Sequence, residues 1–370
     1  MNFQLSDQTI LHLSLINGVG PATIKLIIEH IARENLPQIY TYSASDFQAC
    51  GIYFERAVKI VAGLKDRSLL DKELALIEKH HISWCAFGSS DYSSLLASIE
   101  QPPAIVYYQG RNLFNQNNAI AFVGARKADA YARLVVDKLV PPLVQSGWVI
   151  VSGGALGTDS FVHDKVVKLQ GKTIAVLGSG LLHWYPASNH QLFHQIIQTG
   201  GMIVSCFPLQ TQPIPSNFPA RNRIIAGLSQ GTVVVQAAAK SGALITADFA
   251  VEQGREVFAV PGSIEHGLHD GCHNLIAQGA KLVTTAHDIL IELVGVQAVT
   301  EFQQDNQLSL PLSDVCPYEK AILEITLIAT STETLVSKID ISFDDLMVKL
   351  FDLNLQGKIT QDMMGLWKRI

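Results

Sequence analysis

The stretch of sequence that decides the fold is residues 120–169, IAFVGARKADAYARLVVDKLVPPLVQSGWVIVSGGALGTDSFVHDKVVKL. Its two apolar runs, Ile120–Val123 and Trp148–Val151, each lead through a glycine-containing turn into a segment of helical spacing, Tyr131–Val144 and Ser160–Leu169. Strands that are covered on both faces carry consecutive apolar residues rather than an alternating pattern. The stretch therefore predicts two strand–helix units of a parallel α/β sheet.

The same alternation extends to both sides of this stretch, from about residue 82 to residue 290. Strands and helices that alternate at this spacing indicate an α/β fold with a doubly wound, mainly parallel sheet. Ligands of such sheets bind at the loops that follow the carboxyl ends of the strands. Further strands are predicted at Ile105–Tyr108, Thr173–Leu177, Met202–Ser205, Thr232–Val235, Val257–Val260 and Lys281–Val283. Further helices are predicted at Asn189–Gln198, Ala220–Leu228, Leu244–Gln253 and Asn274–Gln278.

The segments that flank the α/β region have helical patterns. Residues 1–80 predict an N-terminal helical domain whose break at Gly18-Val19-Gly20-Pro21 resembles the turn of a SAM or helix-hairpin-helix domain. Such a turn either presents backbone N–H groups to a DNA phosphate or only reverses the chain, and both interpretations stay open. Residues 81–295 form the predicted Rossmann-like domain, and the polar, aperiodic residues 296–312 suit a linker.

The last segment, residues 313–370, predicts a winged-helix-like domain. Three helices are expected at Tyr318–Ile328, Thr332–Lys338 and Phe343–Leu355, and Gly357-Lys358-Ile359 and Gly365-Leu366-Trp367 suit a short hairpin. The third helix carries Asp344, Asp345 and Asp352 against only Lys349, whereas helices that read the major groove neutralise phosphates with Lys and Arg. We therefore expect protein interaction or support of a dimer rather than binding to duplex DNA.

Composition limits the class of protein. With 48% hydrophobic and 16% charged residues, the chain can bury a large core and is not expected to be disordered. No apolar run is long enough to cross a bilayer, and the first residues lack a basic segment, so we expect a cytoplasmic protein without membrane contact. The five cysteines form no C-x-x-C pair, and Cys272-His273 alone cannot supply four ligands, so no metal site is expected.

Three glycine-rich loops follow consecutive predicted strands. They are Gly124-Ala125-Arg126-Lys127, the turn that begins Ser152-Gly153-Gly154, and Gly178-Ser179-Gly180. Glycine lets the backbone approach an anion, and the helix that follows points N–H groups at it. One such loop is weak evidence, because glycine often serves only to reverse the chain, but three on neighbouring strand ends favour an anion-binding groove.

Basic residues that could complete this groove follow in two later segments. Arg221-Asn222-Arg223 opens a predicted helix, and Lys240-Ser241 precedes another. Guanidinium groups at a helix start bind phosphate through both charge and donor geometry. The alternative is that the arginines are ordinary solvated helix residues. A net charge of −6 does not oppose a local basic groove, since residues 296–370 hold 11 Asp or Glu against six Lys or Arg.

Several enzyme and cofactor motifs are incomplete. Gly171-Lys172-Thr173 lacks the first glycine of a P-loop and precedes a strand, and Gly178-x-Gly180 has His183 where a dinucleotide fingerprint has its third glycine. Neither G-x-S-x-G nor H-E-x-x-H occurs. Asp159 and His163 share a helix face and could form an acid/base pair, although a structural hydrogen bond is the commoner role. No cofactor is expected.

Together these motifs resemble the DprA/Smf family of DNA-processing proteins. The resemblance spans about residues 82 to 290 and is carried by Val123–Arg126, Val151–His163, Thr173–Gly180 with Tyr185-Pro186, Phe218–Ser229, Ser241–Ala247 and Val257–Gly262. It implies an extended Rossmann-like fold that acts as a homodimer without catalytic turnover. Such a protein binds single-stranded DNA in a basic pocket and loads the recombinase RecA onto it during natural transformation. The DNA-binding candidates are Gly124, Arg126, Lys127, Ser152, Gly153, Gly178, Gly180, Arg221, Asn222, Arg223, Lys240 and Ser241. Phe218, Trp184 and Tyr185 could stack on bases, although core packing is the commoner role.

The sequence departs from the family's usual pattern at three positions. Gln236 and Cys206 stand where acidic residues are common, and Ala187 stands where a lysine is frequent, a loss that could weaken binding or shift the DNA path. The missing acids weaken the main rival, a nucleotide phosphoribohydrolase on a related Rossmann fold, which needs a carboxylate after a strand like Thr232–Val235. A nucleotide-sensing interaction protein is the third hypothesis.

Overall fold

The computed structural model describes residues 5–116, 118–295, 317–339, 341–355, 358–362 and 365–369. The chain divides into two compact units, Met1–Val299 and Thr300–Ile370. The predicted linker, residues 296–312, lies outside the described residues. The division into four parts therefore stays a prediction, and the two units are described in turn.

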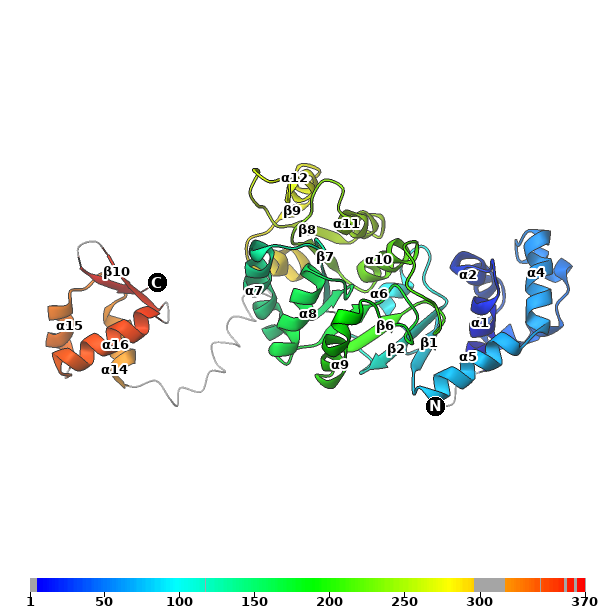
Figure 1. The fold of residues 1–370 in the computed structure, drawn as a ribbon, viewed down its shortest axis with the longest axis horizontal. Coiled ribbons are helices and arrows are strands. Elements are labelled where there is room, and N and C mark those ends of the chain that lie inside the picture. The colour runs from blue at the N-terminus through cyan, green and yellow to red at the C-terminus, as the bar shows by residue number, and fades with distance from the viewer. Residues whose placement is uncertain are drawn as a thin grey trace. The chain divides into compact units, whose positions relative to one another are not determined.

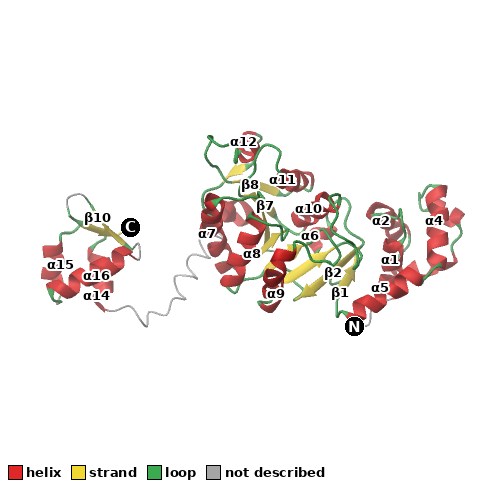
Figure 2. Ribbon diagram, viewed as in Figure 1, coloured by secondary structure: helices red, strands yellow, loops and turns green. Residues whose placement is uncertain are grey.

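A nine-stranded sheet forms the centre of the first unit (Figures 1 and 2). Its order is β1-β2-β6-β5-β4-β3-β7-β8-β9. The six pairings from β6 to β9 are parallel, while β2 pairs antiparallel with both β1 and β6. The doubly wound, mainly parallel sheet predicted from the sequence is confirmed. The strands are β1 (Ser83–Ala86), β2 (Ile105–Gly110), β3 (Ala119–Val123), β4 (Val149–Ser152), β5 (Thr173–Val176), β6 (Met202–Ser205), β7 (Gly231–Val234), β8 (Glu256–Ala259) and β9 (Lys281–Leu282).

The apolar runs form strands because both faces of the sheet are covered. Along β3, Ile120 and Phe122 belong to one hydrophobic cluster, whereas Ala121 and Val123 belong to another. Since successive strand residues point to opposite faces, a run without polar interruption fills both layers at once. Helices α7 and α8 supply the first cluster, and α10 and α11 supply the second. Figure 1 shows these helices around the sheet.

The helices of the α/β region agree with the predicted segments to within a few residues. The largest difference is at α12, which begins four residues before its predicted start. Two further helices, α6 and the one at residues 286–295, were not predicted from the sequence. The bounds are α6 (Ser94–Ala97), α7 (Ala130–Gln145), α8 (Thr158–Lys168), η2 (Ala187–Asn189), α9 (His190–Gln198), α10 (Asn217–Gly227), α11 (Gly242–Glu252) and α12 (Asp270–Ala277).

The N-terminal helices pack directly on the β1/β2 side of the sheet. Ile10 and Leu13 share one hydrophobic cluster with Trp84 and Tyr107. Two polar contacts also join the parts: the Glu73 carboxylate accepts a 2.8 Å hydrogen bond from the Leu209 N–H, and Arg33 donates to the Phe87 carbonyl while pairing with Asp7. The bounds are α1 (Leu5–Leu15), α2 (Pro21–His30), η1 (Arg33–Thr41), α3 (Ala44–Ala49), α4 (Phe54–Lys65) and α5 (Ser68–Lys79).

The second unit has the winged-helix layout that the sequence predicts. Three helices, α14 (Pro317–Ile325), α15 (Thr332–Lys338) and α16 (Phe343–Leu355), precede the antiparallel pair β10 (Ile359–Gln361) and β11 (Trp367–Arg369). They enclose their own small core, which includes Ile322, Leu335, Leu346, Leu350, Ile359 and Trp367. The first helix ends three residues earlier than predicted.

Three general findings concern the described part of the chain. None of its helices has both the length and the apolar character that crossing a bilayer requires. Four free cysteines are seen there, of which Cys50, Cys85 and Cys272 are buried. No three His, Cys, Asp or Glu side chains within the described ranges are grouped so that they could hold a metal ion.

Candidate functional site

The loops that follow β3, β4 and β7 meet α10 around one open groove, at the carboxyl edge of the parallel strands. The groove has a volume of about 760 Å³, and we call it the edge groove. The structure brings six of the predicted residues together in its lining, namely Gly124, Arg126, Arg221, Asn222, Lys240 and Ser241. A parallel sheet places its ligands at this edge, so the location agrees with the expectation from topology.

Charge in the edge groove is positive. Arg126, Arg221 and Lys240 line it together with a single acid, the buried Asp159. Arg126 and Lys240 are exposed, and within the described ranges neither has a carboxylate within ion-pairing distance. Their charges are therefore available to an anionic ligand.

The first turn of α11 adds backbone donors. Ser241, Gly242 and Ala243 line the groove, and the Ser241 hydroxyl caps its own helix by accepting from the Ala243 N–H at 3.3 Å. Helix starts of this kind favour anions through their N–H groups and their dipole. Ser241 thus acts through the helix that it caps, and the cations and the helix start face the same space.

Arg221 is buried and holds the loops of the groove together. Its side chain is 5% exposed, and its Nη1 donates to the carbonyl of Gly153 and, at 2.5 Å, to that of Val176, while its Nε donates to Asn222 Oδ1 at 3.1 Å. Burial lowers the pKa of Arg221 to about 10, so the guanidinium keeps its proton at neutral pH. Arg221 gives the groove positive charge and also ties the ends of β4 and β5 to α10.

Asp159 interacts electrostatically with this arginine, and the described part of the chain shows no direct ion pair between them. Burial raises the pKa of the Asp159 carboxyl above its ordinary value of 3.8, and the Arg221 charge opposes that rise. One carboxylate oxygen of Asp159 accepts a 3.2 Å hydrogen bond from the Ala155 N–H. The predicted alternative, an acid/base pair with His163, is not formed: His163 Nδ1 bonds to Thr173 Oγ1 at 2.8 Å, and burial lowers the pKa of His163 to about 3. His163 is a neutral structural residue.

The remaining predicted residues lie beneath or beside the groove. The Ser152 hydroxyl donates to the Phe122 carbonyl at 2.7 Å, and the Gly153 carbonyl accepts from Arg221. A Cβ at Gly178 would lie 2.9 Å from the Phe218 ring, and one at Gly180 would meet the carbonyls of Pro208 and Leu209. These close approaches explain the glycines through packing. Lys127 is exposed in the turn after Arg126, and Arg223 lines a neighbouring cavity.

Aromatic residues contribute more to the groove than the sequence analysis expected. Phe218 and Tyr185 line it with their ring centroids 5.7 Å apart, and Tyr185 is 46% exposed, so core packing does not describe it. The Arg126 guanidinium lies 5.1 Å from the centre of the Phe218 ring. Trp184, in contrast, packs against Phe193 and His194 of α9, as expected for a core residue. The sequence contained one indication that Phe218 lines the groove. Phe218 lies three residues before Arg221, and that spacing puts both side chains on one side of a helix.

Gln236 occupies the place where the rival hydrolase would need a carboxylate. Its side chain is fully buried; its Oε1 accepts from the Asp129 N–H at 3.3 Å and its Nε2 lies 3.2 Å from His269 Nε2. The amide bridges two loops instead of facing the groove. Asp159 is therefore the one carboxylate in the described lining, and the Arg221 charge acts on it.

Comparisons with known proteins agree with this arrangement. Residues 83–294, which include the whole sheet and every predicted binding residue, match the family described as DNA recombination-mediator protein A. The chain belongs to the DNA recombination-mediator protein A family. One relative is the DNA processing protein DprA of Bacillus subtilis, 43% identical over 225 residues, which are 60% of this chain and 75% of the relative.

Solved structures show the family fold. The chain is similar to DNA processing protein A from Streptococcus pneumoniae, with a TM-score of 0.69 and 34% identity over 79% of this chain and 99% of that one. It is also similar to DNA processing protein A from Helicobacter pylori, with a TM-score of 0.52 and 27% identity over 58% of this chain and 95% of that one. The description of the second structure concerns its single-stranded DNA binding mode.

The second unit has a different surface chemistry. Its α16 exposes four large apolar side chains, Phe343, Met347, Val348 and Phe351, at 56%, 38%, 60% and 61%. Lys349 of the same helix bonds to Glu319 at 3.2 Å. An apolar stripe in the place of a recognition helix favours protein contact over phosphate contact.

Proposed function

We propose that this protein binds single-stranded DNA in the edge groove and acts as a recombination mediator in the cytoplasm. The observation that carries the proposal is the convergence of two unpaired cations, Arg126 and Lys240, with the start of α11 and the Phe218 ring. Groups of this kind bind a single strand through its phosphates and through stacking on its bases. The binding mode named for the Helicobacter pylori relative supports the same ligand.

Each component has a separate role in the proposed complex. Phosphates lie against Arg126, Lys240 and the N–H groups at the start of α11, while Arg221 keeps the loops in place and adds positive charge from below. One base stacks on Phe218, whose ring also lies next to the Arg126 guanidinium and the Tyr185 ring. Phosphate and stacking contacts do not identify a base, so sequence preference is slight.

The finer parts of the proposal concern assembly and partners. The bound strand is protected and handed to RecA during natural transformation and homologous recombination, in line with the family description of a recombination mediator. The protein works as a homodimer, which places two grooves on one strand and increases affinity through avidity. Ile264, which is 84% exposed after β8, is an apolar side chain that a second copy would cover.

The proposed protein has no catalytic turnover. Asp159 is committed to Arg221, and the buried amide of Gln236 replaces a carboxylate, so the groove lacks a free acid or base beside its ligand. The alternative is a nucleotide phosphoribohydrolase, for which the raised pKa of Asp159 is the one favourable observation. Release of a base from nucleoside monophosphates by the purified protein would support that alternative.

Fluorescence anisotropy with labelled oligothymidine and its duplex, at several salt concentrations, tests the main proposal. The variant is Arg126→Ala/Lys240→Ala. Its control is Arg111→Ala/Lys172→Ala, which removes the same charge at the ends of β2 and β5 opposite to the groove. We expect the groove variant to lose affinity and to lower the slope of log K against log salt by roughly 1.4, since each lost phosphate contact contributes about 0.7.

Two outcomes would contradict the proposal. If the control variant loses as much affinity as the groove variant, binding is not located in the edge groove. If the wild-type protein does not bind the single strand, the DNA-binding function itself is wrong, and turnover of nucleotides becomes the next measurement.

A further inference from the structure

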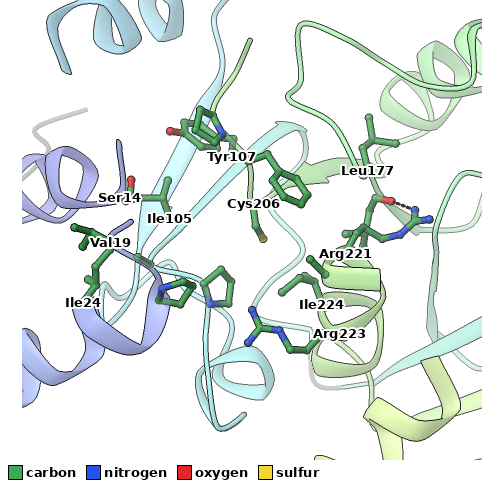
Figure 3. Close-up of a pocket in the computed structure, with 17 residues that line it drawn as sticks. Ser14, Val19, Ile24, Ile105, Tyr107, Leu177, Cys206, Arg221, Arg223 and Ile224 are labelled. Atoms are coloured by element: carbon green, nitrogen blue, oxygen red, sulfur yellow. Dashed lines mark hydrogen bonds between the residues drawn. The ribbon is translucent and has the colours of Figure 1, made fainter. Parts of the chain in front are cut away.

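A second cavity lies beside the edge groove, between the N-terminal helices and the sheet. It has a volume of about 280 Å³, and we call it the helical-side cavity. Figure 3 shows its lining from three parts of the chain: Val19 and Ile24 near the α1–α2 turn, Ile105 at the start of β2, and Ile224 of α10. Val176, Leu177 and Cys206, at the ends of β5 and β6, complete its floor. The two hollows therefore lie at the same edge of the sheet, over neighbouring strands.

Helix α10 is the wall between the two hollows. Its residues Ala220, Arg223 and Ile224 line the helical-side cavity, whereas Phe218, Asn222 and Ile225 line the edge groove. Within each of these two sets, successive residues are three or four positions apart or adjacent, so each set lies on one side of the helix. Arg221 lines both hollows. A strand that leaves the edge groove over α10 therefore reaches the helical-side cavity next.

The size of the helical-side cavity suits one planar ring system. An apolar protein cavity of about 150 Å³ holds a benzene molecule, so a cavity of about 280 Å³ has room for a single base but not for a base with its sugar and phosphate. Phe207 and Tyr107 contribute rings to a lining that is otherwise mostly aliphatic. The Cys206 thiol is neutral because burial raises its pKa to about 12.

The charge of the lining suits an adjacent phosphate. Arg221 and Arg223 are its charged residues, and no acid is found among the described residues that line it. Arg223 is half-exposed, and its hydrogen bond to the Gln101 carbonyl, at 2.5 Å, uses one of the five N–H donors of a guanidinium. The remaining donors can reach a phosphate at the mouth while a base occupies the apolar interior.

We propose that the helical-side cavity takes one unstacked base of the DNA strand that is bound in the edge groove, with the neighbouring phosphate on Arg223. The inference rests on the proposed function and adds a second binding position to it. The walls are mostly aliphatic, and Ser14, Tyr107 and Cys206 are their uncharged polar side chains, so few hydrogen bonds to base edges are available and base preference is slight. The N-terminal helices then serve DNA binding by closing this cavity, whether or not their glycine turn contacts phosphate.

Oligothymidines that carry 2-aminopurine at one position test the proposal, because the emission of this base changes when it leaves its stack. Ala220→Phe and Ser14→Leu fill the cavity from opposite sides; Ala220 is exposed and Ser14 lies on α1, away from the edge groove. Ala62→Phe, at an exposed position of α4 outside both hollows, is the control. Melting temperatures confirm that all variants are folded.

We expect the emission of one position to change on binding to the wild type and to the control, and not to the filled variants. Affinity should fall roughly 5- to 150-fold in both filled variants, which corresponds to one stacked base. If the filled variants bind and respond like the wild type, the cavity holds no base although the edge groove still binds DNA. If the free 2-aminopurine nucleotide alone gives the cavity-dependent change, the occupant is a nucleotide and not a strand. Absence of any strand binding by the wild type overturns this inference together with the proposed function.

Discussion

Arg221 and Arg126 line the same groove, and substituting them should have different consequences. Arg221→Met removes a buried guanidinium that donates to the carbonyls of Gly153 and Val176, and it also removes the positive charge that acts on the Asp159 carboxyl. A buried acceptor that loses its donor costs about 1–3 kcal/mol, so two carbonyls together cost about 3–5 kcal/mol, near the middle of the doubled range. Arg126 is exposed, so Arg126→Ala should change stability by less than about 0.5 kcal/mol.

Thermal unfolding followed by circular dichroism measures this difference. For a large domain, 1 kcal/mol shifts the melting temperature by about 2–4 °C, so we expect Arg221→Met to melt roughly 6–20 °C below the wild type. Arg126→Ala should melt within about 2 °C of it and yet lose affinity for oligothymidine. Asp159→Asn should recover part of the loss when it is combined with Arg221→Met, because it removes the unpaired charge.

The reasoning would be refuted by an Arg221→Met protein that melts like the wild type but no longer binds DNA. Arg221 would then be a contact residue whose hydrogen bonds to the loops contribute little. A second contrary result is full additivity of the Asp159 and Arg221 substitutions, because two charges that interact electrostatically must show a coupling energy.

Three further predictions concern other parts of the molecule. Burial raises the pKa of Glu73 above 4.5, so the folded state binds the Glu73 proton more tightly than the unfolded state does. The charged carboxylate therefore destabilises the folded protein. This destabilisation is greatest at neutral pH and fades as the pH falls towards 4.5. Glu73→Gln keeps an acceptor for the Leu209 N–H, so it should raise the melting temperature at pH 8, and this gain should shrink as the pH falls. A gain that does not depend on pH would contradict the raised pKa of Glu73. Phe218→Ala should weaken oligothymidine binding by about 1–3 kcal/mol in anisotropy titrations while Phe218→Trp retains it, and equal loss in both variants would argue against stacking. A chain that ends at residue 295 should bind oligothymidine within about twofold of the full protein, because α16 presents apolar side chains rather than cations, and a large loss would show that the second unit contacts DNA.

The sheet could be predicted from sequence because its strands are short and fully apolar. In β3, β4 and β5, the apolar runs are too short to form a helix, and glycine-containing turns mark the ends of the runs. β1 escaped prediction since it has only four residues and begins with Ser83, although Trp84, Cys85 and Ala86 are buried. Its antiparallel pairing with β2 depends on contacts between distant segments, which local patterns do not contain.

The positions of the binding loops were predictable, but the roles of individual residues in them were not. Arg221 and Arg223 look alike in sequence, yet Arg221 is buried and Arg223 is half-exposed. The available signal was that Arg221 lies three and four residues before Ile224 and Ile225, both of which are buried in α10. An isolated arginine on an apolar helix face needs buried acceptors, and only the tertiary structure shows that Gly153 and Val176 supply them.

The charge of the groove bears on how a protein of net charge −6 could hold a polyanion. Two unpaired cations, Arg126 and Lys240, contribute only about 1.4 to the slope of log K against log salt. This contribution is small beside the slope of proteins that make six or more phosphate contacts. Stacking on Phe218 and insertion of a base into the helical-side cavity add affinity that salt does not screen, because these contacts bury apolar surface. A second groove in a homodimer multiplies both terms without any new contact in the chain. The proposed mode of binding thus depends on the number of bases held along the strand more than on the density of positive charge.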